Sequence, residues 1–337
     1  MAHIQWKDRF NINYKKIDDQ HRKLVEILND LIDLISKRSG PERVGPIFHR
    51  LFEYTQVHFT YEERFLRKAR FVGGLAHKAE HASFIRKLLD LNQRYDASNP
   101  RLLEETLAFL QHWYLHHIMD MDMKYVPVMQ GLLGKCEIQA IVFDANSVLF
   151  PFDLGRFGDR VAKLAGADAR TVGDSLSRNL ALLASYAKGE LASAAFAKKI
   201  SELAGTSLAE RELAGAYAAA FVPADPVLAL LPRLSSACKL GLVASAGEWH
   251  SERVLETHPA IAAFAAQSLS WRVGTVHPDP VLLEDFLEKL DLIAEECVFV
   301  SADEGYLSRA GEMLFHTLPF TGAGDLEEGL RRQGLKV

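Results

Sequence analysis

Two pairs of metal-binding side-chain types lie between residues 58 and 81. His58 precedes Glu62 by four residues, and His77 precedes His81 by the same interval. Residues four apart share one face of a helix, and the glycines of the intervening 71–74 segment end a helix readily. A single histidine on a helix is more often solvated or satisfied by a neighbour. Two facing pairs instead predict a metal site, because buried polar groups are costly unless something satisfies them.

Three further side chains lie on predicted helical faces and extend this set. His21 falls on the apolar stripe of a helix that begins near Asp18, and His117 falls on the stripe of a later helix. Asp122 follows His117 by five residues, so at ~100° per residue the two side chains diverge by ~140°. They converge only through side-chain reach or through a local distortion of the helix. The candidate metal ligands are His21, His58, Glu62, His77, His81, His117 and Asp122.

Five imidazoles and two carboxylates are too many ligands for one zinc ion, which normally takes four. The set fits two six-coordinate irons that share bridging carboxylates and leave one position open. Other histidines of this region do not fit by spacing. His112 and His116 lie off the face of His117, and we expect His3 and His49, which have no partner at helical spacing, to be surface or structural residues.

Four amphipathic helices with short connections must position these ligands. Apolar residues recur at helical period over residues 24–35, 42–67, 75–94 and 103–118. Ser39-Gly40-Pro41 and Ser98-Asn99-Pro100 mark breaks between helices. Residues 1–17 are expected to form an extended arm that packs its aromatic side chains on a neighbouring surface. The pattern predicts an all-α, up-down-up-down four-helix bundle over residues 1–131.

Five short motifs carry a resemblance to a known family. They are IxWxxxF from Ile4 to Phe10, DxQHxxL from Asp18 to Leu24, then HxxxE, HxxxH and HxxxxD. In this order and spacing, residues 4–130 resemble the bacteriohemerythrins. The resemblance implies a non-haem di-iron centre with an oxo or hydroxo bridge that binds O2 reversibly. It assigns one iron to His77, His81 and His117, the other to His21 and His58, and the bridging positions to Glu62 and Asp122.

The same resemblance implies an apolar O2 pocket beside the irons. Phe59, Trp113 and Ile118 would limit the access of water, and a dry pocket slows irreversible oxidation of the metal. Tyr114 departs from the family, which usually carries leucine at this position. Its hydroxyl either hydrogen-bonds the bound oxygen or admits water. Alternatively, Tyr114 only packs and turns its oxygen to a backbone carbonyl.

The sequence after residue 136 alternates apolar strands with helical patterns. Predicted strands span residues 138–144, 240–244, 297–300 and 314–317. Their order predicts a doubly wound, Rossmann-like α/β domain over residues 137–337. Asp144, Ser245 and Ser301 end three of these strands, where parallel sheets place their active sites. An Ala-rich helical insertion at about 153–222 interrupts the alternation, and residues 132–136 are expected to link the domain to the bundle.

The order of these segments carries a second resemblance. A strand ending in aspartate, a helical insertion, a strand ending at serine and the HPDP sequence that begins at His277 follow one another. Residues 136–335 therefore resemble the haloacid dehalogenase-like (HAD) hydrolases with a helical cap. The resemblance implies that, in an active domain, Asp144 is the nucleophile and Ser245 is the phosphate-binding hydroxyl.

Three of the functional positions of that family have changed in this sequence. Asn146 stands where phosphatases keep a general acid, and an amide cannot supply that proton. His277 replaces a lysine, which removes a permanent cation from the phosphoryl site. Ser301 and Ala302 replace acidic residues that hold Mg²⁺, with Asp303 one residue late. Because electrostatic terms dominate phosphoryl transfer, we predict a pseudoenzyme, and the sequence leaves Mg²⁺ binding open.

Composition and charge exclude several classes of protein. The 337 residues are 48% hydrophobic and 25% charged, as in soluble globular proteins of two or three domains. Residues 1–131 carry 20 Lys and Arg against 17 Asp and Glu, and the remainder carries 19 against 27, so neither part indicates nucleic acid or a membrane as partner. No apolar run approaches the ~18 residues of a membrane span, and we expect no signal peptide. Three sparse cysteines favour a reducing compartment, which predicts a cytoplasmic protein.

Together these patterns favour a non-haem di-iron O2-binding protein. It would be an oxygen sensor or carrier whose degenerate HAD-like domain is an output module or binds a protein partner. Two alternatives stay open. One is an O2-regulated HAD-type hydrolase, a phosphatase or dehalogenase that uses Asp144. The other is storage or detoxification of oxygen or iron, with the second domain only structural.

Overall fold

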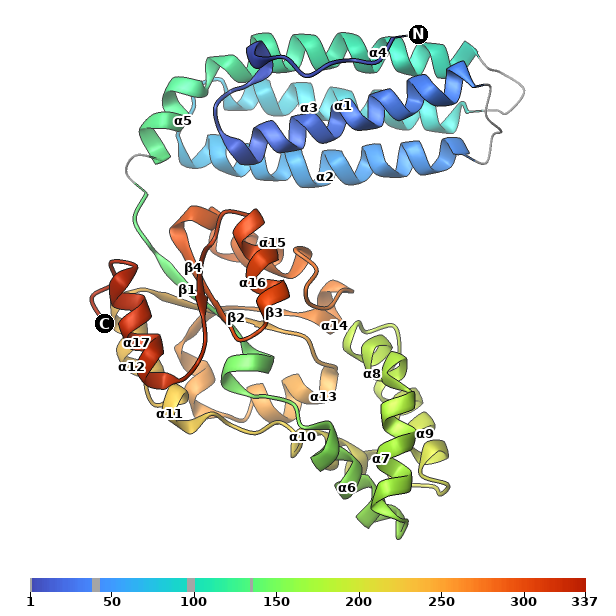
Figure 1. The fold of residues 1–337 in the computed structure, drawn as a ribbon, viewed down its shortest axis with the longest axis vertical. Helices are drawn as coiled ribbons and strands as arrows, with labels where there is room; N and C mark the ends of the chain where they lie inside the picture. Colours follow the sequence, from blue (N-terminus) through green and yellow to red (C-terminus); the bar gives the residue numbers. More distant parts are fainter. Residues whose placement is uncertain (1, 38–42, 96–100, 134–135) are drawn as a thin grey trace. The chain divides into compact units, whose positions relative to one another are not determined.

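The computed structural model describes residues 2–37, 43–95, 101–133 and 136–337, which divide into two compact units, Met1–Cys136 and Glu137–Val337 (Figure 1). The first unit is an antiparallel bundle of helices and the second is a parallel α/β domain, so the predicted fold class is confirmed. The breaks predicted at Ser39–Pro41 and Ser98–Pro100 lie outside the described residues. Within the described part of the chain, no helix has both the length and the apolar character needed to cross a membrane.

Four long helices form the bundle. They are α1 (Lys15–Ser36), α2 (Val44–Lys68), α3 (Gly74–Gln93) and α4 (Arg101–His116). Each contributes apolar side chains to a single core, which explains why their hydrophobic residues recur at helical period. The arm before α1 contains a 3-10 turn (Asp8–Phe10), so it is not extended throughout as predicted. Its aromatic side chains do pack inward: Phe10 and Tyr14 are buried, and Trp6 is partly buried against the bundle core.

The first helix begins three residues earlier than its predicted start at Asp18. Asp18 is buried inside α1 and does not cap it. Its Oδ1 instead accepts a hydrogen bond from the backbone N–H of Ile12 at 2.8 Å. The carboxylate therefore fastens the arm to the helix, a role that depends on a contact between two segments rather than on helix-capping preference.

The bundle unit ends in three short elements. A π-helical turn spans His117–Met121, a 3-10 turn spans Asp122–Lys124, and helix α5 spans Val126–Leu133. Helix α5 includes residues 132 and 133, which the sequence predicts to belong to the linker. The reason is the position of Pro127, which lies in the first turn, where its fixed φ and missing N–H favour a helix start rather than an end.

The second unit is built on five parallel strands in the order β3-β2-β1-β4-β5. Their bounds are β1 (Ala140–Asp144), β2 (Lys239–Ala244), β3 (Phe264–Leu269), β4 (Cys297–Ser301) and β5 (His316–Pro319). Strand β3 is not among the strands that the sequence predicts. Its sequence FAAQSL is half-exposed at the sheet edge, so it lacks the continuous apolar run of a central parallel strand.

Helices cover both faces of this sheet (Figure 1). One face of β1, with Ile141 and Phe143, joins the core that includes α12 (Leu231–Ala237) and α17 (Ala323–Arg332). The other face, with Ala140 and Val142, packs with α15 (Val281–Leu290) and α16 (Glu304–Glu312). Burial on both faces explains why the central strands read as unbroken apolar runs.

Five helices lie within residues 153–222, where the sequence predicted an insertion. They are α6 (Leu154–Ala165), α7 (Ala169–Arg178), α8 (Leu180–Ala187), α9 (Ser193–Leu203) and α10 (Glu210–Ala218). An antiparallel bridge between Phe152 and Phe221 closes the base of this segment. Shorter helices follow it at α11 (Asp225–Leu228), α13 (Glu248–His250) and α14 (Ser270–Val273).

Candidate functional site

All seven predicted metal ligands lie in the interior of the bundle. None has more than 1% of its surface exposed, although all seven are imidazole or carboxylate side chains. Asp122 directly follows a π-turn, His117–Met121. Burial of this many titratable groups is costly unless each finds a partner or binds an ion. The contacts among them therefore decide what the site can do.

One half of the cluster surrounds a single carboxylate oxygen. Glu62 Oε2 lies 3.0 Å from His77 Nε2 and 3.1 Å from His81 Nε2. His81 Nε2 lies 3.0 Å from His117 Nε2. One ligand atom from each of these four residues falls within 4.8 Å of all the others, so the group has the size of one metal's coordination shell.

The other half of the cluster is connected to the first by both carboxylates. His58 Nε2 lies 3.7 Å from Glu62 Oε2, and His21 Nε2 lies 3.3 Å from Asp122 Oδ2. The second oxygen of Asp122 lies 3.2 Å from His117 Nε2. Each carboxylate thus stands between imidazoles of the two halves, the position from which it would bridge two metal ions.

The five-residue spacing of His117 and Asp122 is accommodated by a change in helix type. The chain turns from α-helix to π-helix over His117–Met121, and the Asp122 N–H donates to the His117 carbonyl. This wider turn is the local distortion that the spacing required, and it brings both side chains into the cluster. Single π-turns within helices occur frequently at functional sites.

Three side chains that are not among the predicted site residues contact the ligands and hold them in place. Gln20 Oε1 lies 2.9 Å from His58 Nδ1, and Glu63 Oε1 lies 3.1 Å from His81 Nδ1. Tyr125 donates its hydroxyl to Glu62 Oε1, which leaves Oε2 facing the imidazoles. Such outer contacts fix the ring orientation and tautomer of metal ligands. Gln20 belongs to the DxQHxxL motif, but nothing in the sequence paired Tyr125 with a residue 63 positions away.

Several buried atoms of the cluster have no hydrogen-bond partner among the described residues. They include both nitrogens of His21, one nitrogen each of His58, His77 and His117, and both oxygens of Asp122. Burial lowers the pKa of His21 to about 4, which keeps its imidazole in the neutral, metal-binding form. Burial and the nearby Glu62 raise the pKa of Asp122 to about 7. Buried imidazole nitrogens and carboxylate oxygens without hydrogen-bond partners are suitable ligands for a bound metal ion.

Three of the predicted O2-pocket residues, Phe59, Trp113 and Ile118, are buried in the bundle. The ring of Phe59 stacks on that of His81 with centroids 3.7 Å apart, and Trp113 stacks on His117 at 4.1 Å. These two aromatic rings cover one side of the cluster of candidate ligands. Ile118 is buried in the apolar core of the bundle.

Tyr114 is buried, with its ring 5.5 Å from that of Phe10. Its hydroxyl has no hydrogen-bond partner in the part of the chain that the structure describes, so the alternative in which it bonds a backbone carbonyl is wrong. Burial raises the pKa of this phenol above its ordinary value. Tyr114 therefore remains a protonated hydroxyl with an unused donor inside the bundle.

In the second unit, Asp144 lies at the carboxyl end of β1 with its carboxylate already hydrogen-bonded. Its Oδ2 accepts from Ser147 Oγ at 2.6 Å and from Ser301 Oγ at 2.8 Å, and its Oδ1 accepts from the Asn146 N–H at 3.1 Å. Burial raises the pKa of Asp144, an effect opposed by these hydroxyl donors. Ser147 was not predicted to belong to the site.

The remaining predicted positions of this unit gather at the same end of the sheet. Asn146 Oδ1 accepts the Ser245 N–H at 2.6 Å, and Ser245 Oγ accepts the His277 N–H at 2.8 Å. The His277 ring lies 3.4 Å from Asp303 Oδ2. The Asn146 side chain thus accepts the backbone N–H of Ser245, the residue whose hydroxyl would bind phosphate in an active domain.

This arrangement does not fit Mg²⁺, which prefers an octahedral set of oxygen ligands. Ser301 and Ala302 supply no carboxylate, and the Ser301 hydroxyl donates to Asp144. Asp303 accepts the Tyr306 N–H at 2.7 Å and thereby caps α16. Two serine hydroxyls therefore stabilise the Asp144 carboxylate in place of a cation.

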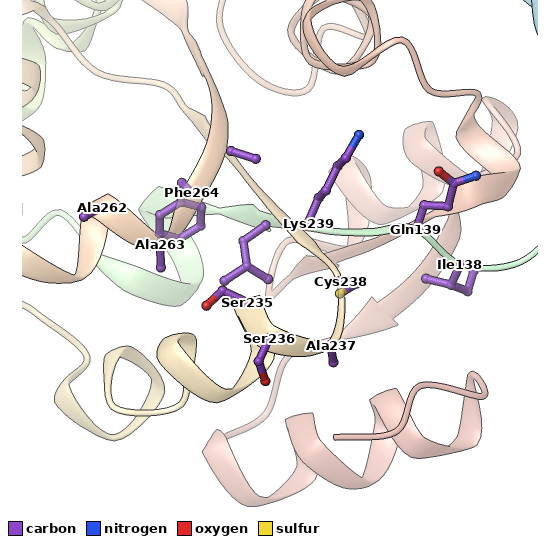
Figure 2. A pocket seen from close by; sticks show the side chains of 12 residues that line it. Ile138, Gln139, Ser235, Ser236, Ala237, Cys238, Lys239, Ala262, Ala263 and Phe264 are labelled. Atoms are coloured by element: carbon purple, nitrogen blue, oxygen red, sulfur yellow. The ribbon is translucent and has the colours of Figure 1, made fainter.

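The opposite end of the strands holds an open groove of about 610 Å³ (Figure 2). It is lined by residues just before β1 and β2, such as Gln139 and Ser236, and by the first residues of β2 and β3, such as Lys239. None of the described residues that line it is a histidine or carries a carboxylate. Its one thiol, Cys238, has its pKa raised to about 11 by burial, which makes it a poor nucleophile. The groove is therefore distinct from the Asp144 site and carries no comparable chemistry.

The two units are similar to different known proteins. The Hemerythrin HHE cation binding domain matches residues 13–129. A bacteriohemerythrin of Clostridium acetobutylicum is 34% identical over 125 residues, which are 36% of this chain and 97% of that protein. One from Pseudomonas aeruginosa (strain LESB58) is 32% identical over 137 residues, which are 40% of this chain and 87% of that protein.

The second unit resembles solved structures of another kind. A HAD family enzyme of Bacteroides thetaiotaomicron, solved as a magnesium complex, superposes with a TM-score of 0.50 and 19% identity. The match covers 58% of this chain and 98% of that protein. At this identity the likeness establishes a HAD-like fold and leaves the chemistry of the domain to its own residues.

Proposed function

The chain belongs, through its N-terminal unit, to the hemerythrin family, and from this premise we propose that it binds O2 at a non-haem di-iron centre. The observation that carries the proposal is the buried cluster in which Glu62 and Asp122 each lie between two sets of imidazoles. The orphaned nitrogens and oxygens of this cluster support bound metal rather than a self-satisfied core.

Each group of residues has a separate task in this proposal. The ligands of one iron would be His77, His81 and His117, those of the other His21 and His58, and the bridges Glu62 and Asp122. Bound iron would supply reversible O2 binding. Phe59 and Trp113 shield the imidazoles of His81 and His117 from water, and Tyr125 holds one oxygen of Glu62.

Anaerobic iron loading tests the proposal directly. The reduced protein should retain about two irons per chain after desalting. Exposure to air should then produce a visible absorption band that disappears when O2 is removed. A protein that keeps no iron, or whose spectrum is indifferent to O2, would contradict the proposal.

For the second unit we propose a catalytically degenerate HAD-like domain that acts as an output or protein-binding module. The hydrogen-bonded Asp144 carboxylate, the Asn146 amide and the missing acidic pair support this reading. Sensing further requires that O2 favour one of two states of the protein. Hydrogen exchange of the second unit that differs between the deoxygenated and oxygenated protein would support a sensor, and identical exchange would favour a carrier or a storage protein.

A cytoplasmic location is also part of the proposal. Cys136, Cys238 and Cys297 form no disulfide in the described structure. Thiols that stay reduced are typical of a reducing compartment.

Substituting Tyr114 by leucine should change the rate at which the oxygenated protein decays to the oxidised form. The Tyr114 hydroxyl is a buried donor with no partner among the described residues, so it is available to bound oxygen or to an entering water molecule. The measurement is the decay of the oxygen-dependent absorption in air. Tyr114→Phe removes the hydroxyl while keeping the ring, and the same decay in all three proteins would rule out a role for it.

Substituting Asp144 by asparagine should not change the rate of phosphoester hydrolysis in the presence of Mg²⁺. Both proteins should show only the uncatalysed rate measured in buffer alone. The carboxylate is held by Ser147 and Ser301, and the site lacks the acid and the cation that phosphoryl transfer needs. The assay follows hydrolysis of p-nitrophenyl phosphate with and without Mg²⁺. Turnover by the wild type that Asp144→Asn abolishes would instead establish the O2-regulated hydrolase.

A further inference from the structure

A second set of metal-binding side chains lies on the outer surface of the bundle, apart from the buried cluster. His112 and His116 are one helical turn apart on α4, and both are exposed. Their rings are nearly parallel, with an interplanar angle of 6° and centroids 6.5 Å apart. Two imidazoles at this spacing on one face of a helix can reach a common ion.

A carboxylate already orients one of these rings. Asp120 Oδ2 lies 3.1 Å from His116 Nδ1, and the two side chains are 64% and 49% exposed. Contact through Nδ1 leaves Nε2 of His116 as the nitrogen that can bind a metal, with its lone pair fixed by the tautomer. A carboxylate behind a histidine also raises the basicity of that ligand.

We propose that His112 and His116 bind one divalent cation of the zinc or copper class, with Asp120 as a positioning residue behind His116. Imidazole ligands suit these ions, and water would complete the coordination. This site does not depend on iron in the buried cluster. The contact joins His116, which caps the start of the π-turn, to Asp120 within that turn. A bound cation would therefore brace the segment that supplies His117, a candidate ligand of the buried centre.

The chain contains a matched control for this site. His49 is likewise exposed on α2 and lies 3.4 Å from Glu53, four residues later. Its position four residues earlier is occupied by Gly45, so this pair lacks the second imidazole. An ordinary surface ion pair would therefore behave alike at both places, and a two-histidine site would not.

Zinc titration tests the proposal, because Zn²⁺ does not exchange electrons with iron. Iron-loaded wild-type protein should bind one more Zn²⁺ per chain than His112→Ala or His116→Ala, while His49→Ala should match the wild type. Asp120→Asn should still bind this additional Zn²⁺, but with an affinity lower by about 10–100-fold. Equal stoichiometry in the wild type and both histidine variants, or an equal loss in His49→Ala, would overturn the site.

Two controls keep this comparison interpretable. Circular dichroism and iron content should be unchanged in the variants, since all the substituted residues are exposed. If the buried cluster takes up zinc instead of iron, the difference of one equivalent between the wild type and His112→Ala still reports on the outer site alone.

Discussion

Replacing His77 by alanine is expected to abolish stable iron binding and, with it, the oxygen-dependent absorption. His77 Nε2 lies 3.0 Å from Glu62 and 3.5 Å from Asp122, so it contacts both candidate bridging carboxylates. Loss of an outer partner of a metal ligand already costs about 10–100-fold in affinity, and loss of a direct ligand should cost more. The measurement is iron per chain after anaerobic loading and desalting.

The control for this experiment is another histidine of the bundle. His49 is exposed and pairs with the exposed Glu53, so His49→Ala should retain the iron content of the wild type. A large-to-small change inside the bundle can also destabilise the fold, and His77→Gln fills the same space with a neutral side chain. If His77→Ala and His77→Gln both hold iron as the wild type does, the proposed ligand set is wrong.

Acid is expected to destabilise the second unit through His250. This side chain is 1% exposed, and its Nε2 has no hydrogen-bond partner within the described residues. Its ring packs on that of Phe221 with centroids 4.1 Å apart. Burial lowers the pKa of His250 from 6.5 to about 3. The folded protein therefore keeps this imidazole neutral over a range in which the unfolded chain binds a proton.

The direction of the pH effect follows from proton linkage. Between pH 6.5 and 3 the unfolded state binds more protons at His250 than the folded state does. The free energy of unfolding is therefore unaffected by this residue above pH 6.5 and falls as the pH is lowered below it. At ~1.4 kcal/mol per pKa unit, His250 alone should cost about 2 kcal/mol of the free energy of unfolding at pH 5. His250→Phe removes the titrating group and should make the unfolding midpoint less sensitive to acid.

Urea unfolding of the full chain at pH 7.5 and pH 5 measures this effect as a difference of differences. Other groups titrate in both proteins, and the comparison of wild type with His250→Phe cancels their contribution. His316 is exposed on β5, so His316→Gln should leave the pH sensitivity of the wild type intact. Equal acid sensitivity in the wild type and His250→Phe would refute the role of His250.

Local spacing in the sequence was enough to predict the helical bundle and six of the seven members of its buried cluster. The seventh, Asp122, also needed a local change of helix type. The four-residue intervals between His58 and Glu62 and between His77 and His81 place each pair on one helix face, whatever the rest of the chain does. Apolar periodicity likewise identified the faces that pack together. The same logic located Asp144 and Ser245 at strand ends, because each followed a continuous apolar run.

Tertiary structure decided the features that join distant segments. The bond from Tyr125 to Glu62 and the pairing of Ser301 with Asp144 link residues 63 and 157 positions apart, which no periodicity encodes. Strand β3 forms because β2 offers it an edge, not because FAAQSL is strongly apolar. Helix and strand period in the sequence determined which apolar side chains and which cluster histidines of the regular elements face inward. Packing between elements determined which of them meet, and at His117 it selected the π-turn that brings Asp122 to the cluster.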